Sequence, residues 1–317
     1  MKFKKILMIG FEMDDLGAAD WERIRQISDA HMLIPKDSKE ITAELAETDC
    51  LLVKLGATVD RKMMDCAPNL KYIGMFGTGY GKVDAVSATE KGITVCNIAG
   101  YSTDGVAELV FALILENIRD ISRAKKQAKN GEYSDGSFSG YEIAGKNFGI
   151  VGLGRIGQRV AAIASAGFNA NVSYWSKNRK PQIESATIKY RETVKDLLSN
   201  SDFVSINLAH TPETEKFFGS DLISEFKKNS VVINLSPMAL LDIDALAQRL
   251  ANKDFTFIFD HPDEITKEQA HLLSKYENCI MYPSIGYITD EATIGKKVMF
   301  VDNLVNYLEG KPSNIVN

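Results

Sequence analysis

Short runs of apolar residues recur along the whole chain and alternate with amphipathic helical stretches. In the first part of the chain, four such runs predict strands at Ile6–Phe11, Cys50–Lys54, Tyr72–Phe76 and Ile93–Asn97. Continuous apolar runs of this length are typical of parallel strands that are buried on both faces. Helical patterns, such as Ala18–Ile27 and Ile41–Glu47, lie between them.

The second part of the chain repeats the same alternation. Its predicted strands are Phe148–Val151, Val172–Trp175, Ile188–Tyr190, Phe203–Asn207, Val231–Leu235, Phe255–Phe259 and Cys279–Tyr282. A helical pattern over Arg159–Ala166 follows the first of them. Strands and helices that alternate in this way are typical of βαβ units. The sequence therefore predicts an α/β protein with two domains, each built around a parallel sheet.

Two long helical patterns, Asp104–Ile118 and Glu291–Leu308, interrupt this rhythm, and a loop rich in Gly, Ser and Tyr lies between Lys129 and Gly145. We interpret the long helices as crossings between the domains, so that the first domain is discontinuous and includes the C-terminal helix. The alternative is two sequential domains with a boundary near residue 145.

The composition narrows the class of protein. A length of 317 residues suggests two domains. With 37 basic and 42 acidic residues and no basic tract, a nucleic-acid or anionic-membrane partner is not expected. The four cysteines show no CxxC spacing, so we expect no metal site and a reducing, cytoplasmic compartment. The longest apolar tract, Val106–Ile118, contains two glutamates and is too short to span a membrane.

The stretch from Asn147 to Gly157 carries a GxGxxG motif at Gly152, Gly154 and Gly157. It follows a predicted strand and opens a predicted helix, which is the context of a dinucleotide-binding turn. In such a turn the first glycine permits the tight bend, the second lets a pyrophosphate approach the backbone, and the third lets helix and strand pack closely. The alternative is a packing turn without a ligand.

NAD-binding proteins usually have an acidic residue about 20 residues after the glycines. Here the predicted strand Val172–Trp175 runs into Ser176-Lys177-Asn178-Arg179-Lys180, with no carboxylate. A basic cluster favours a 2′-phosphate on the adenosine ribose, because each charge-assisted hydrogen bond contributes roughly 1.5–3 kcal/mol. We expect NADP(H) as the preferred cofactor, with NAD(H) as the alternative. An ordinary solvated basic turn is the simpler interpretation.

Several motifs together resemble the D-isomer-specific 2-hydroxyacid dehydrogenase family over nearly the whole chain. They are the stretch Leu70–Asp84 (LKYIGMFGTGYGKVD), Val95-Cys96-Asn97, Val106-Ala107-Glu108, the glycine motif, Thr211-Pro212-Glu213-Thr214, Val232-Ile233-Asn234 and Tyr282-Pro283. The segment YWSKNRK is similar to one found in the glyoxylate and hydroxypyruvate reductases of that family.

The resemblance implies two Rossmann-like domains: a flavodoxin-like substrate domain at 1–100 plus 286–317, and a doubly wound NAD(P)-binding domain at 101–285. It implies a small-molecule substrate and a homodimer, often built with an arm such as residues 120–145. Carried over by position, the substrate loop comprises Lys54, Thr78, Gly79 and Tyr80. The cofactor-binding residues are Gly152, Gly154, Arg155, Ile156, Gly157, Ser176, Lys177, Arg179, Thr214, Leu235, Ser236, Pro237, Asp260, Ser284 and Gly286.

The resemblance fails at the catalytic positions. The family's arginine, which holds the substrate carboxylate, and the glycine after it correspond here to Pro237 and Met238. Its proton-transferring histidine corresponds to Ser284, and the acid that tunes this histidine corresponds to Asp263 or Glu264. A general acid contributes about 10²–10⁴-fold to the rate, so we expect ordinary 2-keto acids to be reduced slowly.

Other residues are candidates for the lost roles. They are Lys54, Glu264, His261, Ser284, Tyr287 and Tyr101. Three hypotheses follow from this pattern. The first is an NADP(H)-preferring oxidoreductase acting on CH–OH groups with an atypical active site. The second is a catalytically silent NAD(P)-binding sensor or scaffold, and the third is a weak reductase of ordinary 2-keto acids.

Overall fold

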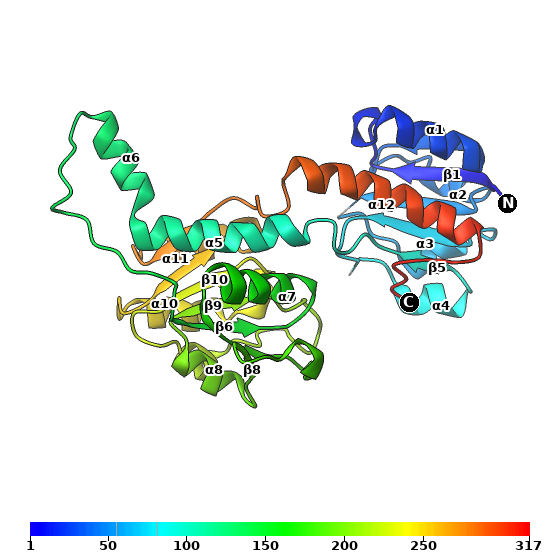
Figure 1. The fold of residues 1–317 in the computed structure, drawn as a ribbon. Coiled ribbons are helices and arrows are strands. Elements are labelled where there is room, and N and C mark those ends of the chain that lie inside the picture. Colours follow the sequence, from blue (N-terminus) through cyan, green and yellow to red (C-terminus); the bar gives the residue numbers. More distant parts are fainter. Residues whose placement is uncertain (55, 81) are drawn as a thin grey trace. The chain divides into compact units, whose positions relative to one another are not determined.

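The structure, a computed structural model, describes residues 1–54, 56–80 and 82–317. The chain divides into two compact units (Figure 1). The first unit comprises Met1–Ser102 and Thr289–Asn317, and the second comprises Thr103–Ile288. The chain therefore leaves the first unit, builds the whole of the second, and returns to the first for its last helix.

The first unit is built on a five-stranded sheet with the order β2-β1-β3-β4-β5, in which every pairing is parallel. The strands are β1 (Phe3–Ile9), β2 (Ser28–Ile34), β3 (Cys50–Lys54), β4 (Tyr72–Phe76) and β5 (Thr94–Cys96). This order is that of flavodoxin-like sheets. Strands β3 and β4 are apolar almost throughout because both of their faces are covered.

Helices cover both faces of this sheet. They are α1 (Ala18–Ile27), α2 (Ile41–Leu45), α3 (Arg61–Asp65), α4 (Ala85–Glu90) and α12 (Asp290–Leu308). One face packs against α1 and α12, with Trp21 and Phe300 in its core, and the other packs against α2, α3 and α4. The ring of Phe300 contacts Phe11 and Phe76, so the last helix belongs to the core of the first unit.

Strand β2 is absent from the predicted strands, and this is a correction. Its sequence SDAHMLI alternates only weakly, and its central residues are exposed or partly buried. It lies at the edge of the sheet and pairs only with β1. An edge strand needs no continuous apolar run, which explains why the apolar pattern did not reveal it.

The second unit is built on a seven-stranded parallel sheet with the order β12-β11-β10-β9-β6-β7-β8. The strands are β6 (Asn147–Val151), β7 (Asn171–Trp175), β8 (Ile188–Tyr190), β9 (Phe203–Ile206), β10 (Val231–Asn234), β11 (Thr256–Phe259) and β12 (Cys279–Met281). Counted from β6, this is the doubly wound Rossmann order with one strand added. The prediction of two α/β domains with parallel sheets is confirmed.

The helices of the second unit also form two layers. They are α5 (Thr103–Arg119), α6 (Ile121–Lys129), α7 (Arg155–Ala162), α8 (Val194–Asn200), α9 (Ser220–Ile223), α10 (Ile243–Leu250) and α11 (Lys267–Leu273). The buried side chains of α5 and α7 pack on one face of the sheet, and those of α8, α9, α10 and α11 on the other. Within this unit, α6 and the loop after it extend away from the two layers (Figure 1).

The helical pattern over Arg159–Ala166 is corrected in its limits. Helix α7 begins at Arg155, directly after the second glycine, and ends at Ala162. A π-helical turn, Ile163–Gly167, follows it.

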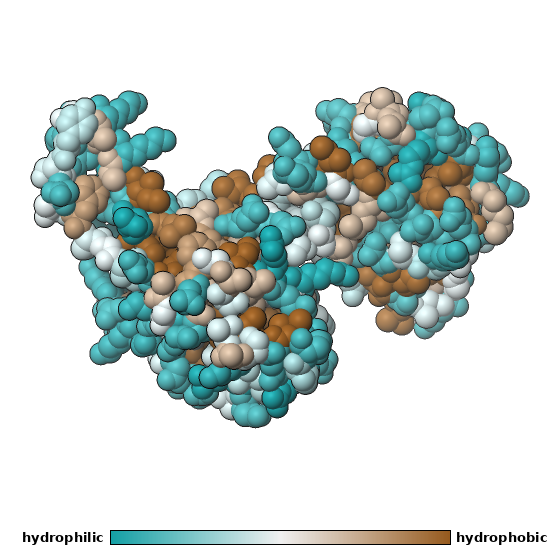
Figure 2. Space-filling model, in the orientation of Figure 1, coloured by the Kyte–Doolittle hydropathy of each residue, from teal (hydrophilic) through white to brown (hydrophobic). Residues whose placement is uncertain are grey.

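In the space-filling view, hydrophilic residues cover most of the visible face of each unit (Figure 2). Among the described residues, no helix is both long and apolar enough to cross a membrane.

Candidate functional site

The glycine motif forms a tight turn between β6 and α7. Gly152 has a φ of +94°, and a Cβ there would lie 2.5 Å from the carbonyl oxygen of Asn207, which follows β9. A Cβ on Gly157 would lie 2.1 Å from the carbonyl oxygen of Gly152. Only glycine fits these two positions, because one has a left-handed backbone and the other lies against the turn itself.

Gly154 differs from its two neighbours in the motif. A Cβ on Gly154 would meet no atom within 4 Å, although this residue is the N-cap of α7. The protein therefore leaves open space at the first turn of the helix, where backbone N–H groups lack partners within the helix. The turn lies between β6 and β9, the point at which the strand order reverses and where ligands bind in such sheets. These features fit a dinucleotide pyrophosphate.

Two basic residues of the turn after β7 are paired with acidic side chains. Lys177 forms an exposed ion pair with Glu213 at 2.6 Å. Arg179 donates two hydrogen bonds of 2.8 Å to the carboxylate of Glu184, which raises the pKa of the Arg179 guanidinium and lowers that of the Glu184 carboxyl. Ser176 is partly buried at the end of the strand. The turn has no acidic residue of its own, but two glutamates from later segments reach it.

Past the end of β10, the chain carries Leu235, Ser236 and Pro237. The hydroxyl of Ser236 donates to the carbonyl oxygen of Ile206 at 3.1 Å, which ties this segment to the end of β9. The side chain of Met238 is buried in the core, and its backbone N–H donates to Glu264 Oε2 at 2.8 Å. Glu264 therefore reaches back from the segment after β11 and fixes the chain beside Pro237.

Ser284 and His261 meet at the carboxyl ends of β12 and β11. Ser284 Oγ lies 3.0 Å from His261 Nδ1, 2.7 Å from the carbonyl oxygen of Asp260 and 2.8 Å from Asp263 Oδ1. His261 Nδ1 also lies 3.8 Å from Glu264 Oε1. These five residues form one polar cluster, in which the imidazole that follows β11 lies beside the serine that follows β12.

Asp260 is the most buried carboxylate of this cluster, with 2 % of its surface exposed. Burial raises the pKa of its carboxyl, and His261 and the backbone N–H of Gly286 partly oppose that shift. Its Oδ1 accepts no hydrogen bond from the described residues, although His261 Nε2 lies 3.4 Å away. A buried acceptor without a donor fits a ligand N–H, such as that of a nicotinamide carboxamide.

The predicted substrate-loop residues lie in the first unit. Lys54, at the end of β3, is held by Asp15 through contacts of 2.7 and 2.9 Å. The hydroxyl of Thr78 donates to the carbonyl oxygen of Ile98 at 2.9 Å, while Gly79 and Tyr80 are exposed. Gly81, within the stretch Leu70–Asp84, lies outside the described residues.

Lys296 on α12 is a residue of this region that the sequence analysis missed. Its Nζ lies 4.2 Å from the centre of the Phe76 ring and 5.9 Å from that of the Tyr101 ring. Burial lowers the pKa of the Lys296 ammonium, and nearby Lys54 lowers it further. Phe300, four residues further along α12, faces the core, so Lys296 lies on the apolar side of the helix. A single lysine among the apolar positions of this helical pattern is the sequence signal that could have identified it.

The remaining predicted residues have simpler surroundings. The hydroxyl of Thr214 donates to the carbonyl oxygen of Ala209 at 2.8 Å and closes a turn after β9. Arg155 is exposed and Ile156 partly buried in the first turn of α7. Gly286 is buried against Asp260, where a Cβ would lie 3.3 Å from Oδ2. Tyr287 is 44 % exposed and is not part of the cluster around His261.

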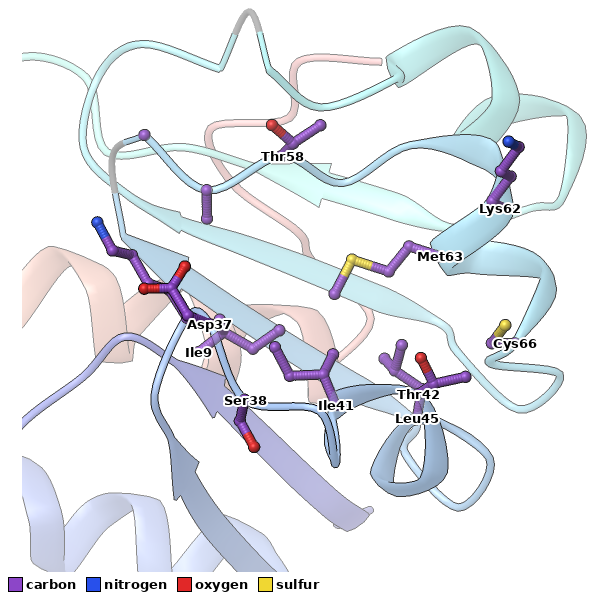
Figure 3. A pocket seen from close by; sticks show the side chains of 13 residues that line it. Ile9, Asp37, Ser38, Ile41, Thr42, Leu45, Thr58, Lys62, Met63 and Cys66 are labelled. Carbon is purple, nitrogen blue, oxygen red and sulfur yellow. The ribbon is translucent and has the colours of Figure 1, made fainter.

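A cavity of about 620 Å³ lies in the first unit (Figure 3). Its walls come from β1, α2, α3 and the segments after β2 and β3. The lining includes Ile9, Asp37, Ser38, Ile41, Thr58, Lys62, Met63 and Cys66. None of the predicted site residues is among its described lining residues. Within the described chain, no three His, Cys, Asp or Glu side chains are arranged to hold a metal ion.

Fold and site together define a two-unit α/β protein whose second unit has a doubly wound sheet and a dinucleotide-type glycine turn. The profile of the D-isomer specific 2-hydroxyacid dehydrogenase NAD binding domain matches residues 111–286. The chain belongs to this family, and it is an oxidoreductase with a nicotinamide cofactor-binding domain.

Individual relatives agree with this family assignment. The chain is 34 % identical to a glyoxylate reductase of Thermococcus litoralis over 285 residues, covering 86 % of this chain and 85 % of that protein. It is 31 % identical to a glyoxylate reductase of Pyrococcus horikoshii, with 89 % and 88 % covered. Among solved structures, an acyclic imino acid reductase (Bsp5) in complex with NADPH and D-Arg has a TM-score of 0.86 at 26 % identity, covering 99 % of this chain and 100 % of that one.

Proposed function

We propose that this protein is an NADP(H)-preferring oxidoreductase that transfers a hydride to or from a small carbonyl or hydroxy compound through an atypical active site. The observation that carries the proposal is the cluster of Ser284, His261 and Asp260 at the carboxyl ends of β11 and β12. It brings an imidazole and a buried acceptor without a donor to the same edge of the sheet as the glycine turn.

In this proposal each group of the second unit has one task. Gly154 leaves the space for the pyrophosphate, and the first N–H groups of α7 bind it. Asp260 Oδ1 accepts a hydrogen bond from the carboxamide of the nicotinamide. When bound, the nicotinamide supplies or takes up the hydride. Because Pro237 occupies the position of the family's arginine, the second unit provides no cation there for the substrate.

His261 and Ser284 transfer the proton that accompanies the hydride in carbonyl reduction. Ser284 Oγ carries a single hydrogen, which it donates to the carbonyl oxygen of Asp260 or to Asp263, so its contact with His261 Nδ1 is one in which the imidazole donates. In the reduction of a carbonyl, Nδ1 would give its proton to Ser284 Oγ while the hydroxyl hydrogen, turned from Asp263 towards the substrate, would pass to the substrate oxygen, which leaves His261 neutral. Asp260 and Glu264, 3.4 and 3.8 Å from the ring, stabilise the charged imidazole. This pair replaces the histidine that the family has at position 284.

The preference for NADP(H) rests on Ser176, Lys177 and Arg179 at the end of β7. The pair of Lys177 with Glu213 is exposed, with each side chain more than 70 % exposed, and such pairs contribute only about 0–1 kcal/mol. A phosphate with two negative charges therefore competes effectively with Glu213 for Lys177, and it adds a second anionic partner for the half-exposed Arg179 beside Glu184.

Calorimetric titration tests this preference. We expect NADPH to bind with a Kd at least ~10-fold lower than that of NADH, since one or two charge-assisted hydrogen bonds separate them. Arg179→Asp should remove the difference and leave NADH binding unchanged. Lys228→Asp, an equal change of charge at an exposed position before β10, is the matched control. Equal or tighter binding of NADH by the unsubstituted protein would overturn the preference.

Reduction of an imine is a second candidate for the reaction. Three carboxylates lie within 4.0 Å of His261, those of Asp260, Asp263 and Glu264. Their negative charge favours a substrate that carries a positive charge, such as a protonated imine. A protonated imine becomes a neutral amine on hydride addition, so it needs no proton donor in that step. The structurally similar imino acid reductase supports this candidate. Assays of 2-oxo acids with and without ammonium distinguish the two reactions.

We also propose a cytoplasmic homodimer. The arm of residues 120–145 extends from the second unit and exposes Ile121 and Tyr133, the latter 84 % exposed. The free cysteines, three of them buried, fit a reducing compartment. Light scattering should give twice the mass of the chain, and the double change Ile121→Glu, Tyr133→Glu should give the monomer mass. A monomer without these changes would contradict the dimer.

A further inference from the structure

The last helix of the first unit carries a buried asparagine. Asn303 lies on α12 between apolar neighbours such as Val301 and Leu304, and only 2 % of its surface is exposed. Burial of a carboxamide is unfavourable unless its oxygen and its N–H groups have hydrogen-bond partners. A leucine at this position would be buried without that cost, so the carboxamide points to a role for the hydrogen bonds that it forms.

The carboxamide of Asn303 connects two segments that are distant from each other in the sequence. Its Nδ2 donates to the carbonyl oxygen of Asn97, directly after β5, at 2.8 Å. Its Oδ1 accepts from the hydroxyl of Ser313 and from Nδ2 of Asn314, both at 2.8 Å. A backbone carbonyl oxygen can only accept, so the nitrogen of the carboxamide has to face Asn97.

Asn97 in turn contacts the predicted substrate loop, which follows β4. The side chain of Asn97 is buried, and its Nδ2 donates to the carbonyl oxygen of Thr78 at 2.6 Å. The hydroxyl of Thr78 donates to the carbonyl oxygen of Ile98 at 2.9 Å. The N–H of Ile98 donates to the carbonyl oxygen of Gly77 at 3.1 Å. Three hydrogen bonds therefore hold the start of the substrate loop against the segment that contacts α12.

The C-terminal segment, Ser313–Asn317, holds the same segment from another side. It runs antiparallel beside β5 (Figure 1). The backbone N–H of Asn97 donates to the carbonyl oxygen of Asn314 at 3.1 Å, and that of Val316 donates to Val95 at 3.0 Å. The backbone of Asn97 is thus fixed by the C-terminal segment as well as by α12, which fixes the direction of its side chain towards the loop.

We propose that Asn303 is a positioning residue for the loop that binds the substrate, and that it acts through Asn97. The inference rests on the proposed function and on the expectation that Thr78, Gly79 and Tyr80 contact the substrate. A loop that is already ordered loses less conformational entropy when a ligand binds to it. Loss of the Asn303 contact should therefore weaken substrate binding more than it slows the chemical step.

Hydrogen exchange followed by NMR tests the connection without catalysis. The reporter is the N–H of Ile98, which donates to Gly77 at the start of the loop. We expect Asn303→Ala to accelerate its exchange about 5- to 10-fold, the effect of losing one neutral hydrogen bond nearby. Asn306→Ala is the matched control on α12, because its amide donates to Ser313 at 3.0 Å on the side of the C-terminal segment. The control should change the rate by less than about 1.5-fold.

A second variant leaves α12 intact, in case Asn303→Ala does not fold. Asn314→Gly removes one of the two donors that orient the carboxamide of Asn303. The φ of +55° at Asn314 suits glycine, so the backbone should not be strained. We expect exchange at Ile98 to be about 2- to 5-fold faster. An unchanged rate in Asn314→Gly and in folded Asn303→Ala would overturn the proposal.

Steady-state kinetics with NADPH and glyoxylate, with and without ammonium, separate positioning from a merely structural role. In Asn303→Ala we expect KM for glyoxylate to rise about 5- to 10-fold, while kcat changes less than about twofold, the pattern of a lost binding interaction. The KM for NADPH should stay unchanged. Partial unfolding would instead lower kcat and leave KM for glyoxylate unchanged, because fewer molecules would be active, and that result would overturn the proposal.

These outcomes separate the positioning role from the proposed function. If exchange at Ile98 responds to Asn303 and the unsubstituted protein transfers no hydride, the connection to the loop stands and the proposed function fails. If hydride is transferred and Asn303→Ala accelerates exchange without changing KM for glyoxylate, the proposed function stands and the positioning role fails.

Discussion

Replacing His261 by glutamine should lower kcat for hydride transfer to a carbonyl substrate about 10²- to 10⁴-fold, the contribution of a positioned general acid. The amide retains a donor toward Ser284 Oγ, now 3.0 Å from His261 Nδ1, but cannot carry the transferred proton. The Kd for NADPH should stay unchanged, because the proposed role of His261 is proton transfer and not cofactor binding. Steady-state kinetics at saturating NADPH, with a calorimetric Kd, measure both quantities.

The control for this experiment is His271→Gln on α11, where the histidine is exposed. Ser284→Ala should reduce kcat to a similar extent, and the double variant should fall little further, since two groups of one relay act as a unit. Additive losses in the double variant, or an unchanged kcat in His261→Gln with a carbonyl substrate, would contradict the proton relay. An unchanged kcat with an imine alone is expected, because that step needs no proton donor.

Gly154→Val should weaken NADPH binding at least ~100-fold and lower the free energy of unfolding by only about 1 kcal/mol. A Cβ on Gly154 meets no protein atom within 4 Å, and the φ of −75° suits any residue, so the cost in stability is that of replacing a glycine by a valine at a helix N-cap. The same side chain fills the space that a pyrophosphate needs. Thermal unfolding and NADPH titration of one sample separate the two effects.

Gly157→Ala provides the contrast within the same motif. Its Cβ would lie 2.1 Å from the carbonyl oxygen of Gly152, so we expect a loss of about 1–3 kcal/mol in the free energy of unfolding from overpacking. Gly295→Ala in α12, where no atom lies within 4 Å, is the matched helix control and should not destabilise. If Gly154→Val bound NADPH as tightly as the unsubstituted protein, the glycine turn would not be the cofactor site.

The features that the sequence predicted well are local ones. The central strands, such as β3, β4 and β10, contain continuous apolar runs, and the glycine turn is encoded within eleven residues from Asn147 to Gly157. Helix α1 has the predicted limits, Ala18–Ile27, because an apolar face and a change of pattern at Ser28 define it. Strand β2 was missed because it is an edge strand with polar residues in its centre.

The features that the sequence did not predict depend on contacts between distant residues. Glu184 pairs with Arg179, five residues before it, and Glu213 pairs with Lys177, thirty-six residues before it. The sequence of the turn itself contains neither glutamate, so it suggested basic residues without acidic partners. Lys296 lies over the ring of Phe76 only because α12 returns to the first unit and packs on β4. His261 was one of six candidates, and its contact with Ser284 depends on the pairing of β11 with β12, which the local sequence does not show.

The central claim is that a hydride passes from a bound cofactor to a small carbonyl or imine substrate. The most direct test incubates the protein with NADPH that carries two deuterium atoms at C4 of the nicotinamide and with a panel of 2-oxo acids, with and without ammonium. Mass spectrometry of the products should show one deuterium on the carbon next to the carboxylate of a hydroxy or amino acid. Tight NADPH binding with no deuterium in any product would contradict the claim and would indicate a cofactor-binding sensor or scaffold.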